Sequence, residues 1–338
     1  MRANQDLRDM ETPTERTVDV LVIGAGMAGL AAAGALQEAG RTVVVVDKGR
    51  GVGGRLATRR VGGATFDHGA QFVTARSARF AEVLEKARVA GAAREWCRGF
   101  SGQRDGHLRW CGCGGMTALA RHMALGLEVV SEKQVRALRQ SGGAWQVDME
   151  DGAHWLAGAV VLTAPVPQAL ELLARGEVGL LPEMERRLAA VEYECCLAVL
   201  AVLDGPSGWP MPGAFAVEGG PVAWMADNQV KGISAEPAIT LHATPEFSSA
   251  HWDQDRSLSG QRLLDAVRPR LGAGVKNFQV HGWRFSKPME AGLEACAVVR
   301  RDPCLILAGD AFAGSRVEGA ALSGWAAAEA LGVAARGA

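Results

Sequence analysis

Three glycines near the start of the chain, Gly24, Gly26 and Gly29, have the spacing of a loop that binds phosphate groups. Apolar residues before the loop predict a buried strand, and an alanine-rich run after it predicts a helix. Gly24 permits a tight turn, Gly26 lets the backbone approach a pyrophosphate, and Gly29 allows the helix to pack closely on the strand. The first N–H groups of the helix, near Met27 and Ala28, face the phosphates in such a loop. The pattern predicts a dinucleotide site.

A carboxylate stands where a dinucleotide site needs one. Asp47 ends a second predicted strand at 42–46 and lies 18 residues after Gly29. That separation is close to the roughly 20 residues expected for an acid that accepts ribose hydroxyls. Lys48 follows directly, and the pair Gly54-Arg55 comes soon after. We therefore expect this segment to continue the dinucleotide site.

Two other groups of reactive side chains carry a weaker signal. The adjacent residues Asp67 and His68 could form an acid–base pair, but neighbouring side chains on an extended strand point apart, which disfavours that role. The seven cysteines have no paired C-x-x-C spacing, so they predict neither a metal site nor a disulfide framework. Reduced thiols in a cytoplasmic protein are the preferred interpretation.

Composition limits the classes of function. The 338 residues suggest two domains, and 36 basic residues nearly balance 37 acidic ones, so the overall charge favours neither nucleic acid nor an anionic membrane. Residues 1–17 are polar, lack the apolar segment of a signal peptide, and predict a disordered tail. The uncharged stretch 20–36 contains four glycines and divides into strand, loop and helix, which argues against a membrane span.

The remaining pattern predicts a mixed α/β fold with two kinds of sheet. An apolar run at 159–162, ending at Ala164, has the character of a central parallel strand, whose carboxyl end is where ligands gather. A strand at 304–308 precedes Gly309-Asp310, and an alanine-rich helix runs on toward 331. Between 167 and 298, alternating segments predict a mostly antiparallel sheet. Further predicted elements are helices at 77–92, 117–125 and 259–267, a strand at 127–130, a hairpin at 145–149 and 153–156, and sheet strands at 195–203, 214–217, 222–225, 239–243 and 277–285.

The glycine loop, Asp47, the Gly54-Arg55 pair and the segment 309–324 together resemble the FAD-binding motifs of amine-oxidase-type flavoproteins. That superfamily usually has Glu at the position of Asp47, a conservative difference. The resemblance implies a Rossmann-like FAD-binding domain and a mostly antiparallel substrate domain, with the topology of p-hydroxybenzoate hydroxylase. It divides the chain into FAD-binding segments 18–75, 116–166 and 298–335, and substrate segments 76–115 and 167–297.

The same resemblance implies roles for individual residues. Gly54-Arg55 adds a phosphate contact, the backbone of Val135 lies against adenine, and Asp310 bonds the ribityl chain. The flavin is expected to be non-covalent, because covalent relatives use a cysteine upstream of the last flavin motif and none lies between Cys196 and Cys296. The other implied FAD-binding residues are Ala70, Gln71 and Phe72 beside the isoalloxazine, Ala164, Gly309, and Arg316 and Val317 at a helix N-terminus facing the flavin N1/O2 edge.

Several segments resemble the bacterial renalase-like branch of this superfamily: 53–55, 67–71, 224–231, 241–244, 283–288 and 315–320. The resemblance implies oxidation of 2- and 6-dihydro-NAD(P) to NAD(P)+, with O2 reduced to hydrogen peroxide. A dihydropyridine that loses hydride becomes aromatic without a general base, so we expect positioning groups: Trp224 and Trp283 as walls, Asn228 and His242 as hydrogen-bonding groups. The substrate is expected to enter by its nicotinamide end, with the adenosine half loosely held. Core packing is an equally good explanation for each tryptophan, and a satisfied strand histidine for His242.

Two alternatives stay open. The first is an amine oxidase, although many of these flank the flavin with two tyrosines and this chain has one, Tyr193. Trp or Phe could take the place of the missing tyrosine. The second is a non-catalytic FAD-binding redox sensor, for which the adjacent Cys195 and Cys196 would be the reactive pair. These cysteines fall in an apolar strand, which favours a core position.

Overall fold

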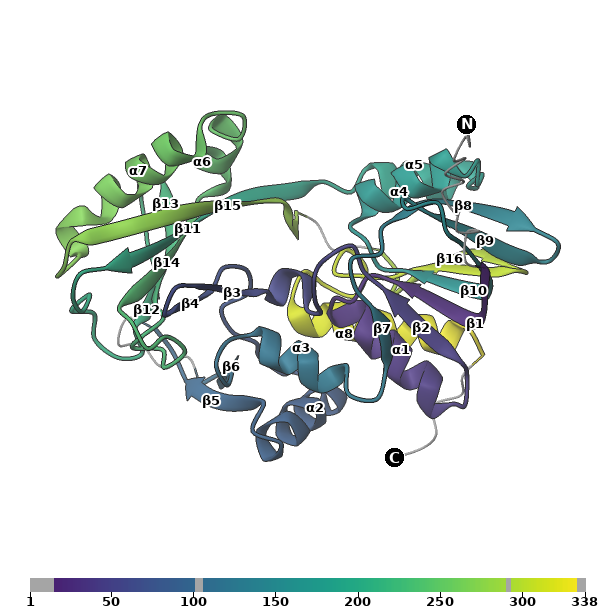
Figure 1. The fold of residues 1–338 in the computed structure, drawn as a ribbon, viewed down its shortest axis with the longest axis horizontal. Coiled ribbons are helices and arrows are strands. Elements are labelled where there is room, and N and C mark those ends of the chain that lie inside the picture. The colour runs from purple at the N-terminus through teal and green to yellow at the C-terminus, as the bar shows by residue number, and fades with distance from the viewer. Residues whose placement is uncertain (1–14, 101–105, 290–292, 333–338) are drawn as a thin grey trace, which may run out of the picture.

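Two sheets of different kind lie at opposite ends of the molecule, in a computed structural model that describes residues 15–100, 106–289 and 293–332 (Figure 1). The first sheet has eight strands, five of them parallel in the order β17-β10-β1-β2-β7. Antiparallel β16 extends one edge, and β9 and β8 continue from β10 as an antiparallel flap. These strands are β1 (Glu15–Ile23), β2 (Val43–Val46), β7 (Glu128–Val130), β8 (Val135–Ser141), β9 (Ala144–Met149), β10 (His154–Leu162), β16 (Ala297–Arg301) and β17 (Cys304–Leu307).

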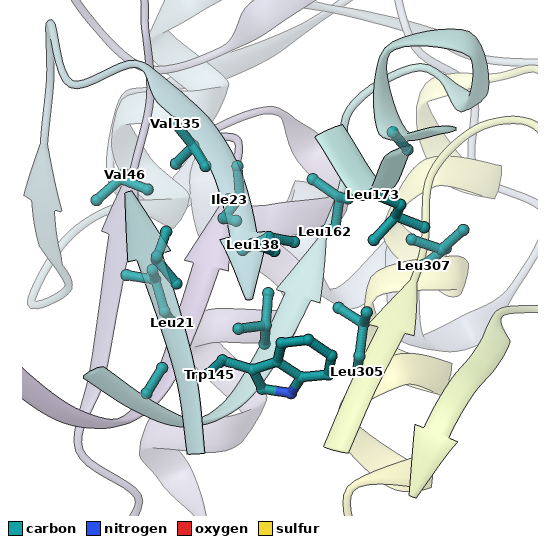
Figure 2. Close-up of a cluster of buried hydrophobic side chains, with 14 of the residues drawn as sticks. Leu21, Ile23, Val46, Val135, Leu138, Trp145, Leu162, Leu173, Leu305 and Leu307 are labelled. Carbon is teal, nitrogen blue, oxygen red and sulfur yellow. The ribbon is translucent and has the colours of Figure 1, made fainter. Parts of the chain in front are cut away.

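The central strand β1 is buried on both faces, as expected for a parallel strand between helices. Val20 and Val22 face the alanine-rich helices α1 (Met27–Glu38) and α8 (Val317–Ala330), which pack on each other. Leu21 and Ile23 face the opposite side, where they join a buried cluster that includes Leu138 of β8, Trp145 of β9 and Leu173 of helix α4 (Val166–Arg175) (Figure 2). This arrangement places the carboxyl end of β1 beside the start of α1.

Two sequence-based boundaries need correction in this sheet. The first strand begins at Glu15 rather than 18, and its first three residues pair with residues 154–156 of β10, so 15–17 are not part of a tail. The strands expected at 153–156 and 159–162 form one continuous strand. Gly158 lies within this strand, where a Cβ would come 3.0 Å from the Asp19 carbonyl oxygen. One half of β10 therefore pairs with both β9 and β1. Residues 1–14 of the expected tail lie outside the described residues.

The second sheet has five antiparallel strands in the order β12-β13-β14-β11-β15. Its members are β11 (Tyr193–Leu203), β12 (Ala214–Ala216), β13 (Val222–Asp227), β14 (Ala238–Ala243) and β15 (Val275–Pro288), each overlapping a strand expected from the sequence. Helices α6 (Pro245–Ala250) and α7 (Arg256–Val267) cover one face. The hairpin of β3 (Thr58–Val61) and β4 (Ala64–Asp67) packs on the other through Ala64 and Phe66.

The segments between the sheets are short elements that the sequence indicated only in part. Helix α2 (Ala78–Val89) buries Phe80 and Leu84 in a cluster that includes Trp325 of α8, so it packs beside the nucleotide-binding helices. The other elements are the hairpin β5 (Ala93–Cys97) and β6 (Arg109–Gly112), α3 (Thr117–Met123), α5 (Pro182–Ala189) and the 3-10 turns Gly54–Leu56 and Arg268–Arg270. No helix in the described part of the chain is long and apolar enough to cross a membrane.

Candidate active site

The glycine loop at 24–29 has the geometry that the spacing of its glycines predicts. Gly24 has a φ of +109°, and a Cβ on Gly29 would lie 1.8 Å from the Gly24 carbonyl oxygen, so both positions require glycine. A Cβ on Gly26 would meet no atom within 4 Å, which leaves open space beside the first turn of α1. Thr163, for which the sequence predicted no role, donates its hydroxyl to the Ile23 and Gly24 carbonyls at 2.9 and 3.2 Å.

Asp47 is fixed at the end of β2 by two backbone donors. Its carboxylate accepts hydrogen bonds from the Ala25 N–H and the Gly49 N–H, both at 2.6 Å. The acid therefore lies against the glycine loop, where a nucleotide-binding carboxylate is expected. Lys48 is exposed, and Val135 and Ala164 lie at the start of β8 and just after β10.

Arg55 and Asp310 form a bidentate ion pair, which the sequence analysis did not anticipate. The two N–O distances are 2.6 and 2.8 Å, and Arg55 also donates to the carbonyls of Phe285 and Ser286 at the end of β15. The neighbouring Gly309 N–H donates to the Ser323 hydroxyl at 2.9 Å. Two positions expected to contact separate parts of FAD are thus joined to each other and to the second sheet.

We expect Asp310→Ala to weaken FAD retention by about ten- to a hundredfold in Kd. The change removes a charge-assisted acceptor worth roughly 1.5–3 kcal/mol and leaves the Arg55 guanidinium without its carboxylate partner. The measurement is fluorescence titration of apoprotein with FAD. Glu329→Gln, which breaks the exposed ion pair with Arg79, is the matched control and should leave the Kd unchanged. Equal affinities for wild type and Asp310→Ala would exclude this role for Asp310.

Asp67 is half of a fully buried ion pair with Lys231. The Lys231 ammonium lies 2.7 Å from one carboxylate oxygen and 2.6 Å from the carbonyl oxygen of Gln71, which it holds in place. The other Asp67 oxygen accepts from the Thr58 hydroxyl at 2.6 Å and the Met116 N–H at 2.7 Å. Asp67 thus anchors the turn after β4, and the expectation that Asp67 and His68 do not act as an acid–base pair is consistent with these contacts.

Three buried polar atoms near this turn have no hydrogen-bond partner among the described residues: the side-chain oxygens of Gln71 and Asn228 and the indole nitrogen of Trp224. The amide groups of Gln71 and Asn228 are already engaged, with the Asp67 carbonyl at 2.5 Å and the Thr240 hydroxyl at 3.0 Å. Thr240 donates in turn to the same carbonyl, so both amides belong to one network. Unsatisfied buried groups of this kind are places where a ligand or water can bind.

His68 connects the turn to the sheet through its backbone. Its carbonyl accepts hydrogen bonds from the Trp283 indole at 2.8 Å and the His242 ring at 3.2 Å. His242 is the cross-strand neighbour of Trp224, and His281 lies on the same row, opposite Ala198. The sheet therefore brings three of the four predicted substrate residues, Trp224, His242 and Trp283, to the face that meets the turn, with Asn228 just beyond β13.

The histidines of this face are uncharged at neutral pH. Burial lowers the pKa values of His68, His242 and His281 to about 4, and their mutual proximity adds to the effect for His281. The His68 ring donates from Nδ1 to the Ala57 carbonyl at 2.7 Å, which suits the neutral tautomer. A face without positive charge at this position favours binding of a neutral aromatic ring.

We expect the pH dependence of stability to fall when His68 is replaced by Asn. The unfolded histidine takes up a proton near pH 6.5, whereas the folded one resists until about 4, so the free energy of unfolding drops as pH is lowered through that window. Removing one such group should reduce the slope by at most about 1.4 kcal/mol per pH unit. Urea unfolding at several pH values measures it. An unchanged slope would show that His68 does not contribute.

A cavity of about 400 Å³ opens between the turn and the start of α8. The Glu318 carboxylate in its wall accepts from the backbone N–H groups of Arg76 and Ser77 and from the Ser77 hydroxyl, at 2.7 to 3.0 Å. Burial raises the pKa of Glu318, but these hydrogen bonds outweigh it, so the net shift is downward. The cavity is lined by Ala70, Phe72, Val73, Thr74, Arg76, His107, Arg109, Ser315, Arg316, Val317 and Glu318, four of which were predicted to contact FAD.

Comparison with known proteins assigns the family. A family model described as flavin containing amine oxidoreductase matches residues 88–332. The chain belongs to this family. A second model, an NAD(P)-binding Rossmann-like domain, matches residues 22–87. The chain is also similar to renalase of Mus musculus, with 24% identity over 328 residues that cover 89% of this chain and 94% of the mouse protein. It is a renalase-like, FAD-dependent oxidoreductase.

Solved structures of amine oxidases share the fold. Cyclohexylamine oxidase from Brevibacterium oxydans superposes with a TM-score of 0.74 at 16% identity, covering 93% of this chain and 98% of that one. A putrescine oxidase with bound putrescine gives 0.71 at 15% identity, covering 94% and 99%. These likenesses confirm the expected combination of a Rossmann-like domain with an antiparallel sheet.

The residues present fit FAD. The open space at Gly26 and the fixed Asp47 carboxylate suit a pyrophosphate and a ribose, and unsatisfied polar atoms gather where the family resemblance puts the isoalloxazine. FAD, when bound, supplies two-electron chemistry by accepting a hydride. The chain would hold it with the glycine loop, Asp47 and Asp310, while the turn at 67–72 lines its ring.

Proposed function

We propose that this enzyme oxidises 2- and 6-dihydro-NAD(P) with molecular oxygen. The substrate loses one hydride and becomes NAD(P)+, and O2 takes up that hydride and one proton to become H2O2. The observation that carries the proposal is the uncharged aromatic face formed by Trp224, His242 and Trp283 against the turn at His68. The similarity to renalase over most of both chains supports the same assignment.

The chemistry of this face suits hydride loss from a ring that needs no deprotonation. With pKa values of about 4 the three histidines are weak bases, and the Lys231 ammonium is held by Asp67 inside the protein, so these groups are poorly suited to deprotonate a substrate. The residues instead orient the substrate ring. The indoles of Trp224 and Trp283 offer flat surfaces against it, and the Asn228 side-chain oxygen, which has no hydrogen-bond partner among the described residues, can accept a hydrogen bond from a carboxamide N–H. Positioning and exclusion of water are then the main contributions of the chain.

An amine oxidase is the second candidate, favoured by the family and by the fold of its relatives. Two features count against a cationic amine. The hydroxyl of Tyr193, the one tyrosine, accepts a hydrogen bond from the Val166 N–H at 3.3 Å. Its ring centre lies 5.5 Å from that of Phe285, and the side chain packs against the core cluster that includes α4. It therefore does not belong to the aromatic face. The cavity wall, in addition, contains the exposed arginines Arg76 and Arg316, and its one carboxylate among the described residues, Glu318, is bound to the backbone of Arg76 and Ser77.

A redox sensor based on Cys195 and Cys196 is not supported by their surroundings. Burial raises the pKa of Cys196 to about 12, and its thiol lies 3.9 Å from the Ala243 carbonyl. Burial raises the pKa of Cys195 as well. A thiol of this kind has little thiolate at neutral pH and reacts slowly.

Steady-state oxygen consumption tests the proposal. With 2- or 6-dihydro-NAD(P), one O2 consumed and one H2O2 formed per NAD(P)+ are expected, with turnover well above that for amines of the size of putrescine. Turnover with amines, and none with either dihydronicotinamide isomer, would replace the proposal with the amine-oxidase reading.

A further inference from the structure

The cavity near α8 contains two exposed arginines, Arg76 and Arg316, whose positive charge the proposed aromatic face does not require. Arg76, Arg109 and Arg316 all line it. Arg76 and Arg316 are exposed to solvent, one just before α2 and the other as the N-cap residue of α8. The Arg109 guanidinium stacks over the rings of Phe72 and Phe100 at 5.5 and 4.5 Å, which orients it beside the turn.

The one carboxylate among the described lining residues does not form an ion pair with Arg76 or Arg316. The carboxylate oxygens of Glu318 accept hydrogen bonds from the backbone N–H groups of Arg76 and Ser77 and from the Ser77 hydroxyl. Within residues 15–100, 106–289 and 293–332, no ion pair involves the guanidinium of Arg76 or Arg316, although the Arg76 charge helps to lower the pKa of Glu318. The guanidinium groups of Arg76 and Arg316 thus remain able to bind an anion, because the contact with FAD expected of Arg316 is through the N-terminus of α8, and Thr74 and Ser315 add hydroxyl donors.

This charge is not needed for the phosphates of FAD. The glycine loop at 24–29, which faces open space at Gly26, contributes no residue to the cavity wall. The cavity is lined instead by Ala70 and Phe72, beside the expected position of the flavin ring, and by the solvent-exposed Arg76. A molecule that enters it with a ring toward Phe72 would place any attached phosphate groups near the arginines.

We propose that Arg76 and Arg316 form an anion subsite that binds the pyrophosphate of the dinucleotide substrate. The proposal rests on the function proposed above and revises the expectation that the substrate is held by its nicotinamide end alone. Guanidinium groups bind phosphate through paired, charge-assisted hydrogen bonds, and their field attracts anions at a distance. The subsite would select phosphorylated dihydronicotinamides over the riboside and over cationic amines.

The test compares wild type with Arg76→Gln and the double variant Arg76→Gln/Arg316→Gln, each normalised to bound FAD. Arg301→Gln, an exposed arginine on β16, is the matched control. The ratio of kcat/KM for 6-dihydro-NAD to that for the corresponding dihydronicotinamide riboside should fall at least about tenfold in the double variant, and the wild-type ratio should fall with added salt. A ratio equal to that of wild type would overturn the subsite.

A binding measurement separates the subsite from the proposed function. ADP-ribose carries the pyrophosphate but no nicotinamide, so calorimetric titration of the FAD-loaded enzyme with it needs no turnover. The subsite predicts binding to wild type and to Arg301→Gln, and at least about tenfold weaker binding to the double variant. If no dihydronicotinamide is oxidised but this pattern holds, the subsite stands and the proposed function fails. If ADP-ribose does not bind wild type, or binds all variants alike, the subsite is wrong.

Discussion

Replacing Lys231 with methionine is expected to lower the free energy of unfolding by about 3–5 kcal/mol. The side chains of Lys231 and Asp67 are completely buried, and their ion pair joins the loop after β13 to the turn after β4. Removal of the ammonium leaves a buried carboxylate without its counter-ion and frees the Gln71 carbonyl that the ammonium holds at 2.6 Å. Urea unfolding followed by tryptophan fluorescence measures the loss.

Two further variants make the interpretation specific. Lys86→Met removes an ammonium from an exposed ion pair with Glu82 on α2 and should leave the unfolding midpoint unchanged. Adding Asp67→Asn to Lys231→Met should recover part of the loss, because the amide can still accept from Met116 and Thr58 without a buried charge. Equal midpoints for Lys231→Met and Lys86→Met would contradict the structural role assigned to the pair.

The second large effect concerns Trp283. We expect Trp283→Ala to slow reduction of the flavin by substrate about a hundredfold, because loss of the wall lets the substrate ring leave its reactive position. The indole also holds the His68 carbonyl at 2.8 Å, so its removal loosens the turn beside the expected flavin ring. FAD should remain bound, since the hydrogen bond of the Trp283 indole goes to the His68 carbonyl and not to the glycine loop, Asp47 or Asp310. Stopped-flow absorbance gives the rate, and the absorption spectrum gives the FAD content.

Trp252→Ala is the matched control for this change. Trp252 lies on the opposite face of the second sheet and packs near Gly282, which precedes Trp283 on β15. The Arg256 guanidinium lies 4.5 Å from the centre of the Trp252 ring. The substitution should lower stability without slowing reduction. If both variants reduce at the wild-type rate, Trp283 is a packing residue and the aromatic face does not position the substrate.

The local geometry at the expected cofactor site was predictable because its signals are local. The glycine spacing specifies a turn and a close helix contact within a few residues, and Asp47 ends the strand that follows. The antiparallel strands were recognisable by their alternation, and once they pair in order, Trp224 and His242 become neighbours. The proposed roles of these residues toward substrate stay predictions.

The parts that could not be predicted depend on contacts across the chain. Lys231 reaches Asp67 and Arg55 reaches Asp310 from distant positions, and no local pattern marks either partner. Glu318 lies in the first turn of the alanine-rich helix α8, where an acid suggests only a favourable interaction with the helix dipole. Its carboxylate instead accepts hydrogen bonds from the chain just before α2. The cavity arginines come from three separate segments, so their common location emerges only in the fold.

Anaerobic rapid mixing tests the central claim most directly, because it isolates hydride transfer to the flavin from the reaction with oxygen. The account predicts that 2- and 6-dihydro-NAD(P) bleach the flavin absorbance of the FAD-loaded enzyme quickly and yield NAD(P)+. Ordinary 4-dihydro-NADH and simple amines should leave the absorbance unchanged on the same timescale. The opposite result, with the flavin oxidised after mixing with both isomers and bleached by an amine or 4-dihydro-NADH, would contradict the account.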